Sequence, residues 1–283
     1  MRGWIGGGLA AGAMLLGATQ ASAASVEFRN AVARVVVIPE DRTDISVVIL
    51  KNYARHPLRV NQWSGGRVVV DGGLATGFFG NVMNCSMRDG QPRVTLFGFG
   101  TIGYDDMAQV VVRAPKDVKV TAGGAVFGFI GGTDSLDLTA AGCGDWTVGN
   151  VRGELKLMDA GSGDVHVGSV GQASLRVAGS GDVTTRAIAN GADISIGGSG
   201  DMNLEEASGP VKIRIGGSGD VVIKGGHATN LDVLVAGSGD VGYKGVADSF
   251  TGMVAGSGDV SVTKVTGPVK KSVAGSGDIN VGQ

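Results

Sequence analysis

The stretch that decides the fold is Val211-Lys212-Ile213-Arg214-Ile215-Gly216-Gly217-Ser218-Gly219-Asp220-Val221-Val222-Ile223. Its Gly-Ser-Gly-Asp motif recurs through the second half of the chain, with aspartates at Asp164, Asp182, Asp201, Asp220, Asp240, Asp259 and Asp278. A variant, Gly142-Cys143-Gly144-Asp145, precedes them. The eight aspartates are separated by 19, 18, 19, 19, 20, 19 and 19 residues. A constant period near twenty is typical of one structural unit stacked repeatedly on itself.

Each repeat contains two strand-like runs. Apolar and polar residues alternate before the turn in 211–215 and again after a turn in 260–263, which is the period of a half-buried strand. A turn at the same place in every unit predicts a single-stranded parallel β-helix, with coils stacked about 4.8 Å apart. The hexapeptide pattern of left-handed solenoids is absent, which favours right-handed winding. The predicted fold class is therefore an all-β, right-handed β-solenoid with about 19 residues per coil.

Three parts are predicted along the chain. Residues 1–23 combine Arg2, a short apolar run and Ala21-Ser22-Ala23, as in a secretory signal peptide. The run is shorter than the roughly 20 residues that a membrane-spanning helix needs. Residues 24–121 show non-repeating strand-like runs, which we interpret as early coils and a cap. Residues 122–283 form the repeat solenoid. We therefore expect export, to the periplasm or by secretion to the cell surface, with no membrane span after cleavage.

Phenylalanines concentrate near the start of the repeats. Six of the eight lie between Gly72 and Gly132, at Phe78, Phe79, Phe97, Phe99, Phe127 and Phe129. A solenoid needs its open end covered, because an uncapped coil exposes apolar side chains and strand edges. We interpret this stretch as a cap around the first coil, and an aromatic ligand-binding patch is the alternative. The far end has no recognisable cap, so self-association through the C-terminal coil is expected there.

The composition narrows the choice of partner and of redox chemistry. A formal net charge of −2 without a basic cluster argues against nucleic-acid binding. Cys85 and Cys143 are the two cysteines, and an even number in an exported protein suggests a disulfide that ties the non-repeating region to the first coil. Two buried free thiols are the alternative. No Cys-x-x-Cys is present, so a zinc or redox motif has no basis.

The stacked aspartates must overcome mutual repulsion. Carboxylates about 5 Å apart repel by about 1 kcal/mol per pair in water, and more at a lower dielectric. One explanation is a structural ladder in which each carboxylate accepts hydrogen bonds from turn amides and serine hydroxyls of its own or the next coil. The members would be Asp145, Asp164, Asp182, Asp201, Asp220, Asp240, Asp259 and Asp278. The other is divalent cations between coils. The motif lacks one residue of the calcium-binding Gly-Gly-x-Gly-x-Asp repeat, so the ladder is favoured and no metal or cofactor is expected.

Motifs for catalysis are weak. Two stretches, 98–103 and 237–242, match Gly-x-Gly-x-x-Gly, but neither is expected to open a helix, as dinucleotide binding requires. His56, His166 and His227 are scattered without metal-ligand spacing. Parallel β-helices often carry polysaccharide-cleaving sites, so a carbohydrate-active enzyme is an alternative. A residue kept in every coil serves stacking, however, whereas a catalytic site is a local exception. We therefore predict that the protein is not an enzyme.

The sequence resembles a known family over the whole mature chain. The resemblance rests on Phe28-Arg29-Asn30, on Arg34 to Pro39, on Ala114-Pro115-Lys116-Asp117-Val118 and on the Gly-Ser-Gly-Asp repeats, and it is to the putative auto-transporter adhesin head, or GIN domain, family. It implies an exported bacterial β-solenoid of unassigned function. We expect a non-catalytic structural or adhesion module at the cell envelope, with an envelope protein or polysaccharide as partner. A calcium-stabilised solenoid is the further alternative.

Overall fold

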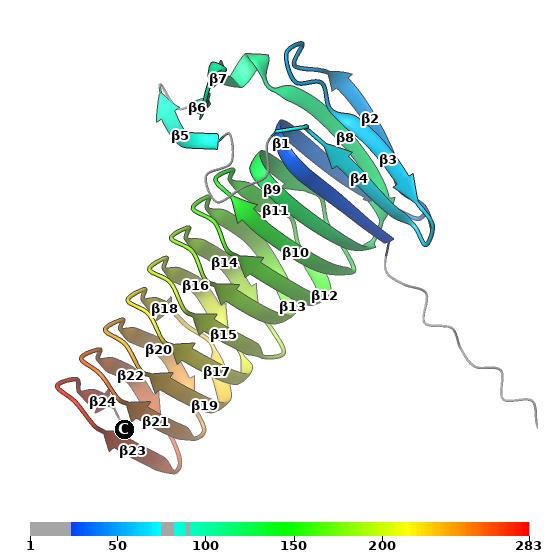
Figure 1. Ribbon diagram of the computed structural model, residues 1–283. Coiled ribbons are helices and arrows are strands. Elements are labelled where there is room, and N and C mark those ends of the chain that lie inside the picture. The colour runs from blue at the N-terminus through cyan, green and yellow to red at the C-terminus, as the bar shows by residue number, and fades with distance from the viewer. Residues whose placement is uncertain (1–23, 75–81, 89–90, 283) are drawn as a thin grey trace, which may run out of the picture.

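The computed structural model describes residues 24–74, 82–88 and 91–282. The expected signal peptide, residues 1–23, lies outside these residues, as do Phe78 and Phe79. The described chain consists almost entirely of strands, stacked in parallel coils that form a long column (Figure 1). The β-solenoid predicted from the repeat is therefore confirmed. Within the described residues, no helix has the length and apolar character needed to cross a bilayer.

The strands fall into an N-terminal set and a repeat set. The N-terminal elements are β1 (Ala24–Glu40), β2 (Ser46–Lys51), β3 (Arg59–Trp63), β4 (Arg67–Asp71), β5 (Val82–Arg88), β6 (Gln91–Leu96), β7 (Gly100–Gly103), the 3-10 helix η1 (Tyr104–Asp106), β8 (Ala108–Pro115) and β9 (Asp117–Ile130). The repeat strands are β10 (Ser135–Gly142), β11 (Trp146–Val148), β12 (Val151–Asp159), β13 (Val165–Val177), β14 (Val183–Ile188), β15 (Ala192–Ile196), β16 (Met202–Ala207), β17 (Gly209–Ile215), β18 (Val221–Ile223), β19 (His227–Val235), β20 (Val241–Ala247), β21 (Phe250–Val254), β22 (Val260–Val265), β23 (Val269–Val273) and β24 (Ile279–Val281).

Two sheets face each other across the core, because each coil contributes one strand before the motif and one after it. The long strands β1 and β9 belong to both sheets because they continue through the motif corner, and β13 does so because it continues through the return between two motifs. The sheet before the motif has the order β3-β4-β1-β9-β10-β12-β13-β15-β17-β19-β21-β23. The sheet after the motif has the order β2-β8-β1-β9-β11-β13-β14-β16-β18-β20-β22-β24.

The first coils do not follow chain order. Strand β1 pairs with β4 and β8 on one side and with β9 on the other, so the later strands β4 and β8 stack above it. Antiparallel strands end the two sheets at this end, with β3 beside β4 and β2 beside β8. The strand β9 runs through residues 121 and 122, so the early coils and the repeats share a continuous strand. A separate antiparallel sheet, β5-β6-β7, projects beside this end of the column (Figure 1).

The core is a set of apolar rows that run along the column. Inward positions alternate with outward ones in both strands of a coil, as in β15, where Ala192, Ile194 and Ile196 are buried. The rows tolerate one large side chain where the neighbour is small. Trp146 is buried against Gly128, where a Cβ would lie 2.1 Å from the indole ring. At the far end, most of β23 is exposed, and self-association there stays a prediction.

The motif glycines are required by stacking between coils. A Cβ on Gly198 would lie 2.0 Å from the carbonyl oxygen of Gly179 in the preceding coil, and a Cβ on Gly200 would lie 2.0 Å from that of Gly181. Neither Gly198 nor Gly200 has a positive φ. The sequence indicated that these glycines form a tight turn. The structure shows that what excludes a side chain is the backbone of the coil beneath.

Candidate binding site

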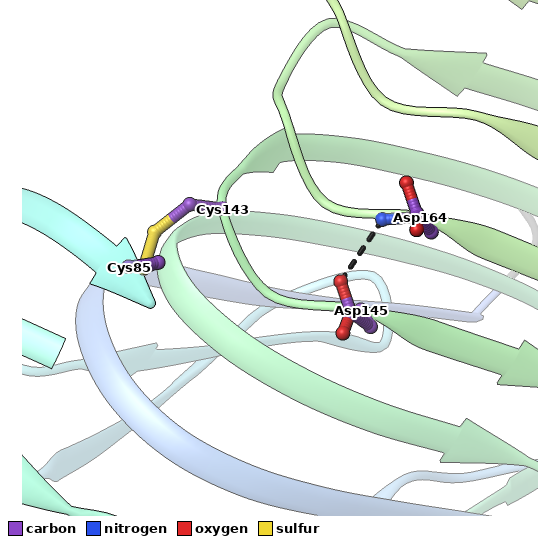
Figure 2. The surroundings of a disulfide bond; sticks show 4 residues. All are labelled: Cys85, Cys143, Asp145 and Asp164. Carbon is purple, nitrogen blue, oxygen red and sulfur yellow. Dashed lines mark hydrogen bonds between the residues drawn. A yellow bond between two sulfur atoms is a disulfide. The ribbon is translucent and has the colours of Figure 1, made fainter. Parts of the chain in front are cut away.

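The motif aspartates form a continuous column of hydrogen bonds. Each carboxylate except that of Asp278, the last, accepts a hydrogen bond through Oδ1 from the backbone amide of the aspartate in the next coil, as Figure 2 shows for Asp145 and Asp164. The seven bonds join Asp164 to Asp145, Asp182 to Asp164, Asp201 to Asp182, Asp220 to Asp201, Asp240 to Asp220, Asp259 to Asp240 and Asp278 to Asp259, with N–O distances of 2.7 to 3.0 Å.

The ladder expected from the sequence had turn amides and serine hydroxyls as its donors. The donor is the amide of the next aspartate, and the serine side chains make a contact of their own, in which Ser199 Oγ lies 3.4 Å from Ser180 Oγ. A hydrogen bond to a charged acceptor is stronger than a neutral one, which offsets the repulsion between stacked carboxylates. Across the described residues, no group of three acidic, histidine or cysteine side chains is arranged to hold a metal ion.

The aspartate column changes its chemistry in the first coils. In the repeats, the residue after each aspartate donates its amide to the carbonyl oxygen of the next aspartate, as Trp146 does to Asp164. Gly128 donates to Asp145 in the same way, so Phe127, the residue before Gly128, takes the aspartate position in the preceding coil. Phe127 is in register with Arg34, and Arg34 with Gln109. The column therefore reads Gln109, Arg34 and Phe127 before its first carboxylate. A cation and an aromatic ring replace the anion of the later coils.

The serine column changes in the same coils. Cys143 takes the serine position of the first motif, and the register continues it through Ala125 and Val32. These residues join a second apolar cluster, separate from the main core, that includes Val94, Leu96 and Ile102 from the β5-β6-β7 sheet and its neighbourhood. The motif is lost here because another sheet covers this corner.

A disulfide fixes that sheet to the column. Cys85 of β5 is bonded to Cys143 in the first motif turn, with a Cα–Cα distance of 5.9 Å and a sequence separation of 58 (Figure 2). Cys85 packs with Cys143 against the second apolar cluster. The bond therefore joins the non-repeating region to the first motif coil.

A third column lies on the outward face of the sheet after the motif. In the repeats it carries Thr147, His166, Thr184 and Asn203, and His166 Nδ1 lies 2.6 Å from the hydroxyl of Thr184. In the first coils the same column is entirely apolar. Its members there are Phe129, Val36, Val111 and Val48. Phe129, Val36 and Val48 are each more than two-fifths exposed, so this apolar row belongs to the surface and not to the core.

A groove of about 380 Å³ opens over these changed columns. Its floor is the outward face of β1, β8 and β9, and η1 and the start of β6 border it. Its lining residues are Arg34, Val35, Val36, Leu50, Pro92, Tyr104, Gln109, Val110, Val111, Phe127, Gly128, Phe129 and Asp145. This volume lies in the range of small-molecule pockets, which are mostly apolar with few polar groups. The described lining contains no serine, cysteine or histidine.

Arg34 is the cation of the groove. Its guanidinium carbon lies 3.9 Å from the centre of the Tyr104 ring, so one face of the group is stacked on an aromatic side chain. The Nε atom is buried and has no hydrogen-bond acceptor among the described residues. A buried donor without an acceptor costs free energy. The guanidinium as a whole has no carboxylate partner among the described residues, so its terminal nitrogens are suited to an added anionic group. Asp145, the other charged lining residue, already accepts the Asp164 amide.

The remaining predicted residues lie away from the groove floor. His56 stacks near Tyr53 and meets the ring of Phe99 edge-on, with centroids 4.3 Å apart. His227 Nε2 lies 2.7 Å from an Asp248 oxygen on the outer surface. The match at 98–103 spans a turn and β7 and is followed by the three-residue 3-10 helix η1, and the match at 237–242 spans a motif turn and the start of β20. Neither opens an α-helix.

Sequence reasoning missed most of the groove. It singled out Phe127 and Phe129 as members of an aromatic group, but gave no role to Arg34, Gln109 or Tyr104. The sequence does not reveal the pairing register between strands of different coils, and that register brings these residues together. Ala31-Val32-Ala33-Arg34 and Gly124-Ala125-Val126-Phe127 occupy the motif position in their coils, but their letters share almost nothing with Gly-Ser-Gly-Asp.

Comparison with known proteins supports the fold. A crystal structure described as a putative lipid binding protein from Parabacteroides distasonis is 18% identical, with 93% of this chain and 94% of that chain covered and a TM-score of 0.53. A putative adhesin from the same organism is 15% identical over 93% of each chain with a TM-score of 0.49, and one from Bacteroides fragilis is 14% identical over 92% of each chain with a TM-score of 0.40. No curated protein matches.

A family model settles the classification. It is described as the putative auto-transporter adhesin, head GIN domain, and it matches residues 100–226 and 187–282. The two matches overlap and together extend from β7 to the last strand. This agrees with the resemblance carried by the repeats. The chain belongs to the putative auto-transporter adhesin, head GIN domain, family.

Proposed function

We propose that this protein is an exported, non-catalytic binding module of the bacterial cell envelope, and that the groove over its first coils is the binding surface. The observation that carries the proposal is the outward column that is polar at Thr147 and His166 but apolar at Phe129, Val36 and Val48. Exposed apolar side chains gathered beside a groove are characteristic of interaction sites.

Two further facts support a binding role. The repeat coils form a column with the groove at one end, and the disulfide between Cys85 and Cys143 links the adjoining sheet to it. The family description refers to adhesion, and one solved protein of similar fold is described as lipid binding. A ligand with a substantial apolar part fits both the groove and these descriptions.

The test uses the apolar fluorescent probe N-phenyl-1-naphthylamine. We expect saturable binding to the purified protein and at least about a tenfold loss of affinity in Phe129→Asp, because burying an uncompensated carboxylate beside the probe is unfavourable. Val222→Asp is the matched control, since Val222 lies in the same outward column between Asn203 and Gly242 of the repeats. Equal binding by both variants would show that the probe binds outside the groove. A lack of saturable binding by the wild type would overturn the proposal. Thermal melting checks that each variant is folded.

A further inference from the structure

We infer that the groove binds an amphipathic carboxylate, a long-chain fatty acid whose head pairs with Arg34 and whose chain lies over the apolar outward row. The inference rests on the proposed function and specifies its ligand. The apolar row is Val48, Val111, Val36 and Phe129. Arg34 lies two residues before Val36 on β1, so head and chain would meet adjacent columns of one sheet face.

The head group is assigned from the state of Arg34. This side chain makes no ion pair or hydrogen bond with any other described residue, and its contact is with the Tyr104 ring. Stacking occupies one face of the planar guanidinium, and its Nε atom is buried. The two terminal nitrogens are the donors left for a ligand. A carboxylate matches these nitrogens with two parallel hydrogen bonds, which is the geometry that arginine favours. The ring of Tyr104 also restricts the guanidinium, so less side-chain freedom is lost on binding.

The two polar neighbours of Arg34 fit an anion. Gln109 lies beside Arg34 in register, and its amide can donate to a carboxylate oxygen. Asp145 carries the opposing charge, but Phe127 occupies the coil between it and Arg34. Two coil spacings separate the two positions by about 10 Å. The Asp145 carboxylate also accepts the Asp164 amide. The cation of the groove is therefore not neutralised by a close partner.

The tail is assigned from the shape of the apolar surface. The outward row crosses the four strands β2, β8, β1 and β9, a span of roughly 14 Å at the usual strand spacing. Leu50, two residues from Val48 on β2 and 64% exposed, lies beside this row at the β2 edge and also lines the groove. The row ends at Thr147, where the polar part of the column begins. A narrow apolar strip with a cation at its side matches one acyl chain with an anionic head.

The experiment compares dodecanoate with dodecanol as displacers of N-phenyl-1-naphthylamine. We expect dodecanoate to displace the probe at a concentration at least about tenfold lower than dodecanol, the ratio given by a charged hydrogen bond. In Arg34→Met the preference should disappear while dodecanol still displaces the probe. Arg214→Met, which removes an arginine paired with Asp193 on the outer face of β17, should keep the wild-type preference.

The outcomes separate the ligand from the site. If dodecanol displaces the probe as well as dodecanoate in the wild type, the carboxylate assignment is wrong while the apolar binding site stands. If the probe binds but neither compound displaces it, the fatty-acid assignment is also wrong. If the probe itself does not bind, both this inference and the proposed function fail. The wild-type comparison decides even where Arg34→Met does not fold.

Discussion

The first coils and the repeat coils share one backbone path but present different surfaces. In the repeats, the corner shows serine and aspartate, and the outward column beside them is polar except at Val222 and Gly242. In the first coils the same positions carry Val32, Arg34 and Val36 on β1. Pairing is parallel between β15 and β17 and between β1 and β9, although the β1–β9 pairing shifts register between Phe28 and Ala31.

The difference shows what stacking demands and what it leaves free. Where bare motif corners stack on each other, the backbones are so close that only glycine fits, and a carboxylate must accept the next amide. Where the β5-β6-β7 sheet packs on the corner, apolar side chains replace the serine and are buried in the second apolar cluster. The corner positions of the first coils therefore need not be glycine, serine and aspartate, and larger side chains there can line a groove.

The strongest way to break the comparison is to add one methyl group to a repeat corner. Gly198→Ala would place a Cβ 2.0 Å from the Gly179 carbonyl oxygen, and the backbone must move to relieve this clash. We expect destabilisation above about 4 kcal/mol or failure to fold, which is outside the range of ordinary substitutions. Denaturant unfolding measures it.

The adjacent residue provides the control for this effect. A Cβ on Gly197 meets nothing within 4 Å, and Gly197 also lacks a positive φ. Gly197→Ala should change the free energy of unfolding by less than about 0.5 kcal/mol. Similar costs for the two variants would show that turn conformation, rather than contact between coils, demands glycine.

The second prediction concerns the bond that joins the two regions. Replacing Cys85 and Cys143 with serine should lower the free energy of unfolding by about 2 to 4 kcal/mol, because the bond closes a long loop. Cys143→Ser also restores the motif found in every later coil. If the double variant melts like the wild type, the β5-β6-β7 sheet does not depend on the bond and packing alone holds it against the column.

The third prediction concerns Asp159, at the border between the regions. It is fully buried, and its neighbours in register are Ala140 and Val177. Burial raises the pKa of this carboxyl, the charges of Asp164 and Asp182 add to the increase, and the hydrogen bond from the Gly161 amide opposes it. Its Oδ2 has no partner among the described residues. We expect Asp159→Val to stabilise the fold by about 1 to 3 kcal/mol at neutral pH, because an unpaired buried charge is removed.

The raised pKa of Asp159 determines how its effect on stability changes with pH. Since the pKa is raised on folding, the contribution of Asp159 is most favourable below the pKa of the unfolded chain. It is lost as the pH rises through the folded value. The gain in Asp159→Val should therefore shrink toward acid pH. Asp159→Asn, which can still accept from Gly161, should remove the same pH dependence. Melting curves over this range check it, and a gain that grows toward acid pH would contradict the account.

The sequence by itself determined the solenoid. The spacing of Gly-Ser-Gly-Asp between Asp145 and Asp278 predicted stacked coils of about 19 residues, and alternation around each motif predicted two strands per coil. The prediction succeeded because each coil contacts chiefly its neighbours, so every repeat needs the same residue types at the same positions. The family resemblance, carried by the same letters, was confirmed for the same reason.

Only the tertiary structure decided the groove. Arg34, Phe127 and Gln109 lie far apart in the sequence, and they meet because β1 is inserted between β8 and β9. The amide donors of the aspartate column likewise depend on the register between coils. Local alternation sets which side of a strand a residue faces, but contacts between coils set which residues become neighbours. Where the repeat is absent, no sequence pattern carries that information.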